Sequence, residues 1–248
     1  MKNLSLIVCV NLDYAIGSKL TNEKFPNNCL EISCENHLLY KISPDLKRFK
    51  QLTTGKTIVM GMNTFKSLGC KPLPNRKNFV FTQNPEISKQ LIEIENVEFS
   101  SFDYPLEDGL KELFLKQTEP EEIFVIGGAQ IYTQTLPFVD KMYITMVYDR
   151  IVPKESLIYF PKINFSEWNI IENSEIYWDQ KSDKKYSFTT YARKPIYKNY
   201  LDWWNKMNLE EKFYKTIKHN SLISGDNTRH PNTLTENEIE IIFKAELN

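Results

Sequence analysis

The arginines are the first candidates for chemistry, because the chain has so few of them. Five of its 31 basic residues are arginine: Arg48, Arg76, Arg150, Arg193 and Arg229. A guanidinium group can pair with a carboxylate or a phosphate through two parallel hydrogen bonds, whereas an ammonium group acts as a point charge. In a sequence that otherwise favours lysine, each arginine is a candidate for anion recognition.

Cysteine and histidine are too sparse to predict a metal centre. Cys29, Cys34 and His37 lie close together in the sequence, but a structural zinc site needs four ligands and no fourth is evident. Four cysteines in the whole chain also fall short of a disulfide framework. We therefore expect no metal, and we expect Cys9 to be a buried free thiol.

The composition is that of a globular chain without affinity for polyanions. Of the 248 residues, 41% are hydrophobic and 25% are charged, and the net charge is -1. Nucleic acids and anionic membranes select a basic excess, so neither is an expected partner. No apolar run is long enough to span a membrane, and residues 1–10 are typical of a buried strand and not of a signal peptide. We expect a soluble cytoplasmic protein.

The apolar pattern alternates between strands and helices over most of the chain. Expected strands are 4–10, 57–61, 78–82, 97–101, 122–126 and 141–148, and expected helices are 44–53, 63–68, 106–116 and 129–136. Ser43 is the expected N-cap of the first helix. Two long strands, 168–178 and 186–194, then form a hairpin. This order predicts an α/β fold: a mostly parallel central sheet flanked by helices, with an antiparallel C-terminal edge strand.

The last part of the chain differs in kind. We expect a domain over residues 1–195 and a small helical C-terminal extension over 196–248, with helices at 200–207, 209–219 and 234–247. Thr235 and Glu238 could form a capping box. The aromatic pairs at 203–204 and 213–214 either pack within the protein or form a surface for an oligomer or a protein partner.

Six short motifs occur in order along these elements. They are LSLIVCV (4–10), IG (16–17), SPDLKRFK (43–50), TIVMGMNTFKSL (57–68), PLPNR (72–76) and VIGGAQIY (125–132). Together they resemble the dihydrofolate reductase family, in which the same motifs come in the same order. The resemblance covers about residues 1 to 195 and implies the fold of that family.

The resemblance implies reduction of 7,8-dihydrofolate to 5,6,7,8-tetrahydrofolate by hydride transfer from NADPH. It places Asp45 where the family has the carboxylate that anchors the pterin, and Thr145 where a threonine hydrogen-bonds to that carboxylate. Tyr40 stands where the family has a tryptophan in the lid over the active site. Taken alone, Asp45 also fits an ordinary helix N-terminal charge, and Thr145 fits an ordinary β-branched strand residue.

Substrate contacts follow from the same resemblance. Arg76 corresponds to the arginine that clamps the α-carboxylate of the folate glutamate tail, a role that suits a guanidinium fork. Without the resemblance it would be a surface arginine, and the apolar positions would be plain core. The resemblance places the substrate-binding positions at Ile7, Val8, Leu46, Phe49, Leu68, Leu73, Arg76, Ile126 and Tyr132. Dihydrofolate and antifolate-type small molecules are therefore the expected ligands.

Cofactor contacts are implied in the same way, with Gly127 and Gly128 joined by a cis peptide before a helix whose N-terminus can receive pyrophosphate. The full set is Cys9, Ile16, Gly17, Gly61, Met62, Asn63, Thr64, Thr82, Gln83, Gly127, Gly128, Ala129, Gln130 and Ile131. Met62 departs from the family, which usually has an arginine there beside the adenosine phosphates. Discrimination between NADPH and NADH is therefore expected to be weaker than is usual in the family.

Two further interpretations stay open. The lid segment, residues 18–43, is longer than is usual in the family, and the extension lies outside the resemblance. A non-enzymatic structural or assembly subunit would account for the extension and for the missing arginine at Met62 in the expected cofactor site. A riboflavin-pathway reductase of the same fold is the other alternative, although its ribosylated pyrimidine substrate has no glutamate for Arg76 to bind.

Overall fold

The computed structural model describes residues 3–19, 36–83, 95–101, 109–110, 113, 121–151, 157–194, 204–223 and 230–247. The chain divides into two compact units, Met1–Lys194 and Pro195–Asn248.

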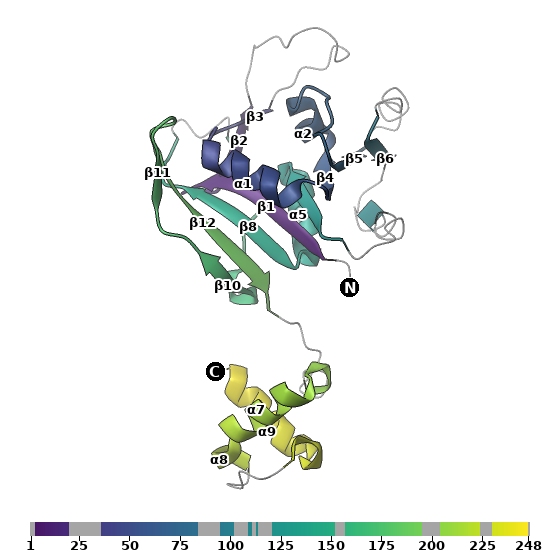
Figure 1. The fold of residues 1–248 in the computed structure, drawn as a ribbon, viewed down its shortest axis with the longest axis vertical. Helices are drawn as coiled ribbons and strands as arrows, with labels where there is room; N and C mark the ends of the chain where they lie inside the picture. Colours follow the sequence, from purple (N-terminus) through teal and green to yellow (C-terminus); the bar gives the residue numbers. More distant parts are fainter. Residues whose placement is uncertain are drawn as a thin grey trace. The chain divides into compact units, whose positions relative to one another are not determined.

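A nine-stranded sheet forms the centre of the first unit (Figure 1). Its strands follow the order β10-β12-β8-β1-β7-β4-β5-β6, and β11 also pairs with β12. All pairs from β8 to β6 are parallel, whereas β12 is antiparallel to β8, β10 and β11. The predicted α/β class is confirmed. The bounds are β1 Leu4–Asn11, β4 Thr57–Gly61, β5 Lys77–Thr82, β6 Val97–Ser101, β7 Ile123–Gly127, β8 Lys141–Val147, β10 Trp168–Asn173, β11 Tyr177–Asp179 and β12 Lys184–Arg193.

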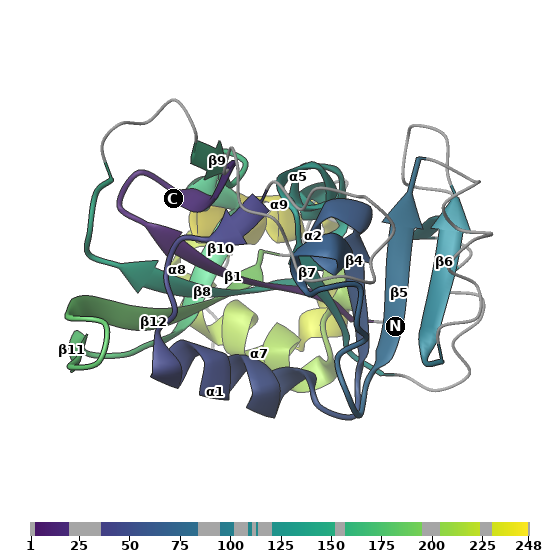
Figure 2. The ribbon, with the colours of Figure 1, turned by 90° about the horizontal axis from the view of Figure 1, so that it is seen from above.

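The two sides of β1 pack in two different apolar clusters, which is why its sequence is a nearly continuous apolar run. Leu6 and Val8 pack in one cluster with Tyr132 of α5, Ala129–Thr135. Ile7 lies in the other cluster, beside Phe49 of α1, Ser43–Thr53. The helices α1 and α5 therefore cover opposite faces of the sheet (Figure 2). A strand buried on both faces needs a continuous apolar run instead of alternation.

Helix α1 begins differently from the sequence expectation. The N-cap is Ile42 and not Ser43, which is already the first helical residue and makes no capping hydrogen bond. Pro44 occupies the first turn, where its missing N–H group needs no acceptor. Ile42 is fully buried and packs beside Val147, so an apolar contact fixes where the helix begins.

The C-terminal hairpin also differs from the expectation of one strand over residues 168–178. That segment forms two strands, β10 and β11, with a register shift between Ile170 and Glu172. Ser174 interrupts the strand: its side-chain oxygen accepts a hydrogen bond from Phe188 N at 2.9 Å, and its own N–H donates to Phe188 O at 2.9 Å. β12 lies between β8 and β10, so β10 is the outermost strand at this edge.

Several smaller elements complete the first unit. Helix α2, Met62–Ser67, follows β4 directly, and the turn η1, Leu136–Phe138, continues α5. The turn η2, Phe165–Glu167, precedes β10. A second sheet has the order β3-β2-β9, with β2 at Ala15–Lys19, β3 at Asn36–Leu38 and β9 at Leu157–Tyr159.

Some expectations fall largely outside the described residues. Of the helix expected at 106–116, only residues 109, 110 and 113 are described, and all three are helical. Most of the enlarged segment 18–43 lies outside, including Cys29 and Cys34. Within the described ranges, no group of three or more histidine, cysteine or acidic side chains is placed to hold a metal ion. No helix in those ranges has the length and hydropathy of a membrane span.

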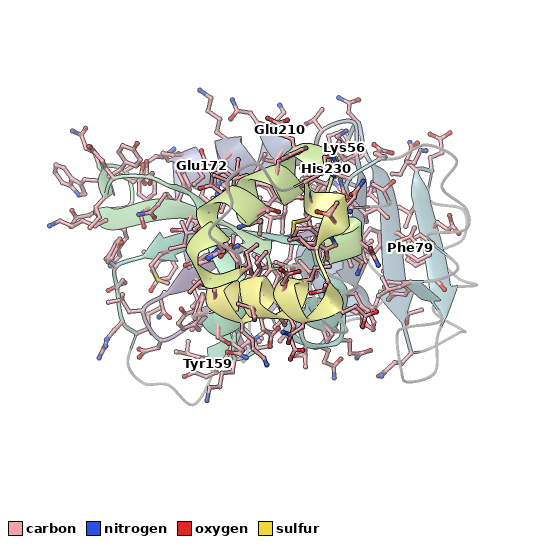
Figure 3. The ribbon with its side chains drawn as sticks, turned by 90° about the horizontal axis from the view of Figure 1, so that it is seen from below. Lys56, Phe79, Tyr159, Glu172, Glu210 and His230 are labelled. Carbon is pink, nitrogen blue, oxygen red and sulfur yellow. The ribbon has the colours of Figure 1, made fainter. Side chains whose placement is uncertain are left out.

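The extension has a small core of its own. Trp204 is 5% exposed and packs against Ile239 and Ile242. His230, labelled in Figure 3, stacks edge-on against the ring of Phe213, with centroids 4.9 Å apart. Residues 204–206 are helical, and the elements with bounds in the described part of this unit are α7 Leu209–Lys218, α8 Asn220–Ile223, η3 Pro231–Thr233 and α9 Glu236–Leu247.

Capping boxes begin the two longer helices of the extension. At α9 the predicted box is confirmed, because Thr235 N donates to Glu238 Oε2 at 2.8 Å and Glu238 N donates to Thr235 Oγ1 at 3.4 Å. A second box, which the sequence analysis missed, joins Asn208 and Glu211 before α7. These local hydrogen bonds satisfy N–H groups that a helix leaves free in its first turn.

One buried amide fastens the loop between α2 and β5. Asn78 is 2% exposed, and its Oδ1 accepts a hydrogen bond from Leu73 N at 2.9 Å. Its Nδ2 donates to Leu73 O at 3.0 Å and to Arg76 O at 3.1 Å. Three hydrogen bonds from one side chain therefore fix the loop that carries two expected substrate contacts.

We predict that Asn78→Ala lowers the free energy of unfolding by about 2 to 3 kcal/mol, because it leaves backbone groups of this loop without partners. Urea denaturation of the full chain measures the effect. Gln51→Ala, at an exposed position on α1, is the control and should stay within about 0.5 kcal/mol of the original chain. Equal stability of the Asn78 and Gln51 variants would show that water replaces the three bonds without cost.

Candidate active site

Asp45 and Thr145 are joined by a short hydrogen bond between two distant parts of the chain. Asp45 lies in the first turn of α1, and Thr145 lies in the middle of β8. Thr145 Oγ1 donates to Asp45 Oδ1 at 2.6 Å. Cys9 on β1 is the cross-strand partner of Thr145, so its thiol side lies next to this pair. The structure thus brings together two of the three expected catalytic residues.

The surroundings of Asp45 act on its charge in opposite directions. Burial raises the pKa of Asp45, while the Thr145 hydroxyl and the positive charge of Arg48 lower it; the net direction is upward. Burial, and then the charge of Asp45, raise the pKa of the Cys9 thiol well above its ordinary value. Cys9 is therefore a neutral neighbour, and Asp45 is the acidic group of this site.

Tyr132 links α5 to strand β1 beside this pair. Its hydroxyl donates to the backbone oxygen of Ile7 at 2.8 Å. Burial, and next the charge of Asp45, raise the pKa of Tyr132, so its hydroxyl keeps its proton. The side chain thus holds β1 against α5. A direct contact of Tyr132 with substrate stays a prediction.

Most of the expected apolar wall lies on the α1 face of the sheet. Leu46 is 44% exposed on α1, beside the wall. Val8 is an exception, because its side chain packs in the cluster on the opposite face, which leaves only its backbone for a ligand. The expected wall residues that share one apolar cluster are Ile7, Phe49, Leu68, Leu73 and Ile126.

Arg76 has unused hydrogen-bonding capacity at the edge of this wall. Its guanidinium lies 5.5 Å from the centre of the Phe49 ring, and Nη2 donates to Thr54 Oγ1 at 3.4 Å. Its Nε is buried and has no hydrogen-bond partner among the described residues. Burial lowers the pKa of Arg76. A buried cation with a free donor is suited to an anionic group of a ligand.

The expected cofactor residues gather at the carboxyl ends of parallel strands. Gly61 ends β4, Thr82 ends β5 and Gly127 ends β7. The Gly127–Gly128 peptide is cis, as the resemblance implied. This is the edge at which open α/β sheets bind their ligands.

The glycine pair leaves room that a side chain would take. Gly127 has a φ of +135°, and a Cβ there would lie 3.1 Å from Thr64 Oγ1; at Gly128 the distance would be 3.3 Å. Thr64, in the first turn of α2, thus presents its hydroxyl to the glycine backbone. Such a close, polar and side-chain-free surface is suited to a cofactor phosphate.

The polar rim around this edge is uncharged at four expected cofactor positions. Met62 is 9% exposed and packs in the core with Met60 and Phe65. Asn63, Gln83 and Gln130 are exposed. Ala129 is half-buried and Ile131 buried in α5, where they contribute backbone and packing.

Tyr40, Ile16 and Gly17 lie toward the lid side. Tyr40 packs near Cys9 in the cluster around Ile42, and burial raises the pKa of Tyr40 to about 12. Gly17 pairs with Leu38 and Ile158 in the small sheet, and Ile16 packs on the core. The Tyr40 hydroxyl therefore keeps its proton at neutral pH, and Tyr40 lies next to the expected position of the nicotinamide.

Arg48 is the residue of this site that the sequence analysis singled out only for its rarity. It follows Asp45 by three positions on α1, and its guanidinium lies over the sheet between β8 and β12. The signal that could have found it is this spacing, because residues three apart share a helix face.

Comparison with known proteins agrees with this geometry. A model of the dihydrofolate reductase family matches residues 27–193. The dihydrofolate reductase of Bacillus subtilis (strain 168) is 34% identical over 163 residues, which cover 66% of this chain and 88% of that protein. The dihydrofolate reductase of Haemophilus influenzae is 32% identical over 166 residues, covering 67% of this chain and 83% of that protein.

The fold is also similar to that of a solved structure. This structure is a dihydrofolate reductase from Enterococcus faecalis complexed with NADP(H) and RAB-propyl, with a TM-score of 0.60 and 25% identity. The match covers 78% of this chain and 97% of that one. On the strength of the family match, the relatives and the site geometry, the chain belongs to the dihydrofolate reductase family.

Proposed function

We propose that this chain reduces 7,8-dihydrofolate to 5,6,7,8-tetrahydrofolate by hydride transfer from NADPH, with Asp45 anchoring the pterin. Reduction of dihydrofolate follows from the family. The observation that carries the finer assignment is the 2.6 Å hydrogen bond from Thr145 to a carboxylate on an otherwise apolar wall. A carboxylate held in this way keeps its second oxygen for a ligand.

Asp45 is suited to the pterin because of its chemistry and its neighbours. The pterin edge presents a ring N–H and a 2-amino group side by side, and one carboxylate can accept both hydrogen bonds. Its negative charge favours the protonated form of the ring. The neighbouring thiol of Cys9 stays protonated and does not compete as an anion. Asp45 therefore orients the ring and supports protonation at N5, with water delivering the proton.

Arg76 would bind the other end of the substrate. Its position beside the Phe49 ring, with Nε free of partners among the described residues, fits the α-carboxylate of the glutamate tail. A ribosylated pyrimidine of the riboflavin pathway has no such carboxylate. The apolar wall between Asp45 and Arg76 would receive the rings that join the two polar ends of the substrate.

NADPH fits the carboxyl edge of the parallel strands. The backbone at Gly127 and Gly128 and the hydroxyl of Thr64 would hold its phosphates, and the β1 backbone at Cys9 would meet the nicotinamide carboxamide. When bound, the cofactor supplies the hydride that reduces the substrate imine at C6. The chain's own task is to hold the two rings against each other in a site poor in water.

The extension is proposed to be an addition to a self-sufficient reductase. Its buried residues Trp204, Ile239 and Ile242 pack with one another, and the expected catalytic residues all precede position 195. Leu209, Tyr214 and Ile217 on α7 are each more than half exposed, at 51%, 62% and 57%. We propose that this exposed side of α7 contacts another copy of the chain or a protein partner.

We predict that Asp45→Asn lowers kcat/KM for dihydrofolate at neutral pH by about 100-fold or more, because an amide cannot carry the charge that favours the protonated pterin. The assay follows oxidation of NADPH, with circular dichroism to verify folding. Glu175→Gln, an exposed acidic position, is the matched control and should keep full activity. Near-normal turnover by the Asp45 variant would remove Asp45 from this role.

We predict that Asn63→Arg raises the preference for NADPH over NADH by about fivefold, which corresponds to about 1 kcal/mol for an exposed ion pair with the 2'-phosphate. Asn63 is chosen because it is exposed, whereas Met62 is buried and an arginine at position 62 would have to turn out of the core. The gain should fall as salt rises. Gln51→Arg, on α1, controls for net charge. A wild-type chain that already rejects NADH strongly would contradict the weakened phosphate site.

We predict that a chain ending at Pro195 keeps kcat/KM for dihydrofolate within about twofold of the full-length value, since no expected site residue lies beyond that point. Steady-state kinetics measure the activity, and light scattering compares the mass of the shortened and full-length proteins. A change of mass assigns an oligomer contact to the extension. A folded but inactive shortened chain would show that the extension contributes to the active site.

A further inference from the structure

Arg48 occupies an unusual position for a cation, between the sheet and α1. Its guanidinium carbon lies 4.6 Å from the centre of the Phe188 ring and 5.5 Å from that of Tyr143. The side chain is 15% exposed. A guanidinium group packs on aromatic faces more readily than an ammonium group, because it is planar and more weakly hydrated. The two rings therefore fix where this charge lies.

Hydrogen bonds fix its orientation as well. Arg48 Nη2 donates to Thr190 Oγ1 at 3.1 Å, and Thr190 Oγ1 donates to Glu172 Oε2 at 3.0 Å. Glu172, labelled in Figure 3, is 3.9 Å from Arg48 Nη2, and its side chain is 71% exposed. Arg48 Nη1 is buried and has no hydrogen-bond partner among the described residues. The positive charge of Arg48 is thus only partly compensated, because Glu172 is in contact with water.

Asp45 is the other acidic group within reach of this charge. The two residues are three positions apart on α1, so their side chains share the face that covers the sheet. From β8 the Thr145 hydroxyl faces Asp45, from β1 the Cys9 thiol, and from α5 the Tyr132 hydroxyl. These two hydroxyl groups and the thiol are neutral. Among the described residues, Arg48 is therefore the positively charged group that acts on the Asp45 carboxylate.

Arg48 has its own set of charged and titratable neighbours. Glu172 faces it from β10 and the Tyr143 hydroxyl from β8. The Tyr143 hydroxyl in turn donates to Glu122 Oε1 at 3.3 Å. Burial, Glu122 and that hydrogen bond raise the pKa of Tyr143 to about 12, so Tyr143 is neutral.

We propose that Arg48 is a positioning residue for the reaction, whose guanidinium, held by Phe188 and Thr190, keeps the Asp45 carboxylate ionised when the cleft excludes water. The proposal rests on the assignment of Asp45 as the pterin anchor. In this proposal Arg48 contacts Phe188, Tyr143 and Thr190 and has no contact with the substrate or the cofactor. It acts through its charge on Asp45, three positions earlier on α1.

The sign of the effect follows from electrostatics. Burial favours the neutral acid, and a nearby cation favours the anion. Without the cation, Asp45 would take up a proton at a higher pH and would lose its charge in part of the range in which the enzyme works. We expect removal of the Arg48 charge to raise the pKa of Asp45 by about one unit, at the lower end of the effect of an opposite charge nearby.

The experiment follows the Asp45 carboxyl carbon by carbon-13 NMR in the full chain without ligands, with Asp45→Asn identifying the resonance. Arg48→Met removes the charge and keeps an apolar stem, whereas Arg48→Lys keeps the charge. Arg48→Gln keeps a donor for Thr190 and serves if the methionine variant does not fold. Lys47→Met removes a charge from the exposed position next to Arg48 and is the matched control.

The expected result is an upward shift of the Asp45 titration in Arg48→Met and Arg48→Gln, with little change in Arg48→Lys and Lys47→Met. The pH profile of kcat/KM should shift in the same two variants. The double variant Asp45→Asn with Arg48→Met should have the same pH profile as Asp45→Asn alone, because the carboxyl group on which Arg48 acts is then missing. An unchanged titration in both uncharged variants, or an equal shift in Lys47→Met, would overturn the proposal. Failure of the pterin assignment is a different outcome: full turnover by Asp45→Asn, whatever the NMR titration shows.

Discussion

The carboxylate of Asp45 is the constraint on which the rest of the site depends, because it places a negative charge against an apolar sheet face. Burial raises its pKa, so the folded state holds this proton more tightly than the unfolded chain does. Between the ordinary value of 3.8 and the raised one, the folded state binds more protons, and its stability falls as pH rises through that window. At neutral pH the charge thus costs folding free energy. The Thr145 hydroxyl and the Arg48 cation offset part of that cost, and a carboxylate kept ionised in this way would suit the protonated pterin of the proposed reaction.

The sheet topology determines which groups can reach this charge. β8 pairs with β1 on one side and with β12 on the other, so Thr145, Cys9 and Phe188 lie side by side although they are far apart in the chain. Helix α1 lies across these strands and carries both Asp45 and Arg48. The parallel strands β4, β5 and β7 run so that their carboxyl ends, with Gly61 and Gly127, meet at one edge. The proposed substrate anchor and the proposed cofactor surface would therefore be two consequences of one strand order.

The cofactor edge and the substrate end differ in charge. At the proposed substrate end, Arg76 is buried beside Phe49, and its Nε has no hydrogen-bond partner in the part of the chain that the structure describes. At the cofactor edge, Met62 is turned into the core, and its exposed neighbours are amides. Affinity for the phosphates there would come from backbone groups and hydroxyls, which recognise a phosphate without selecting between cofactors by net charge. Among the described residues, the proposed substrate site would thus be more strongly electrostatic than the proposed cofactor site.

The fold class, the order of most elements and the family could be predicted from the sequence, because apolar periodicity and short motifs are local properties of the chain. The sequence also determined Asp45 and Thr145 as candidates, but only through the resemblance, since each residue alone fits an ordinary structural role. The interruption at Ser174, the N-cap at Ile42 and the burial of Met62 were decided by tertiary contacts that no local pattern encodes. The same holds for Arg48: its spacing from Asp45 was visible, but its two aromatic rings and Thr190 come from β8 and β12, about 100 to 140 residues later. Only the folded sheet brings these groups together, because the energy of a buried charge depends on its neighbours in space and not on its neighbours in the chain.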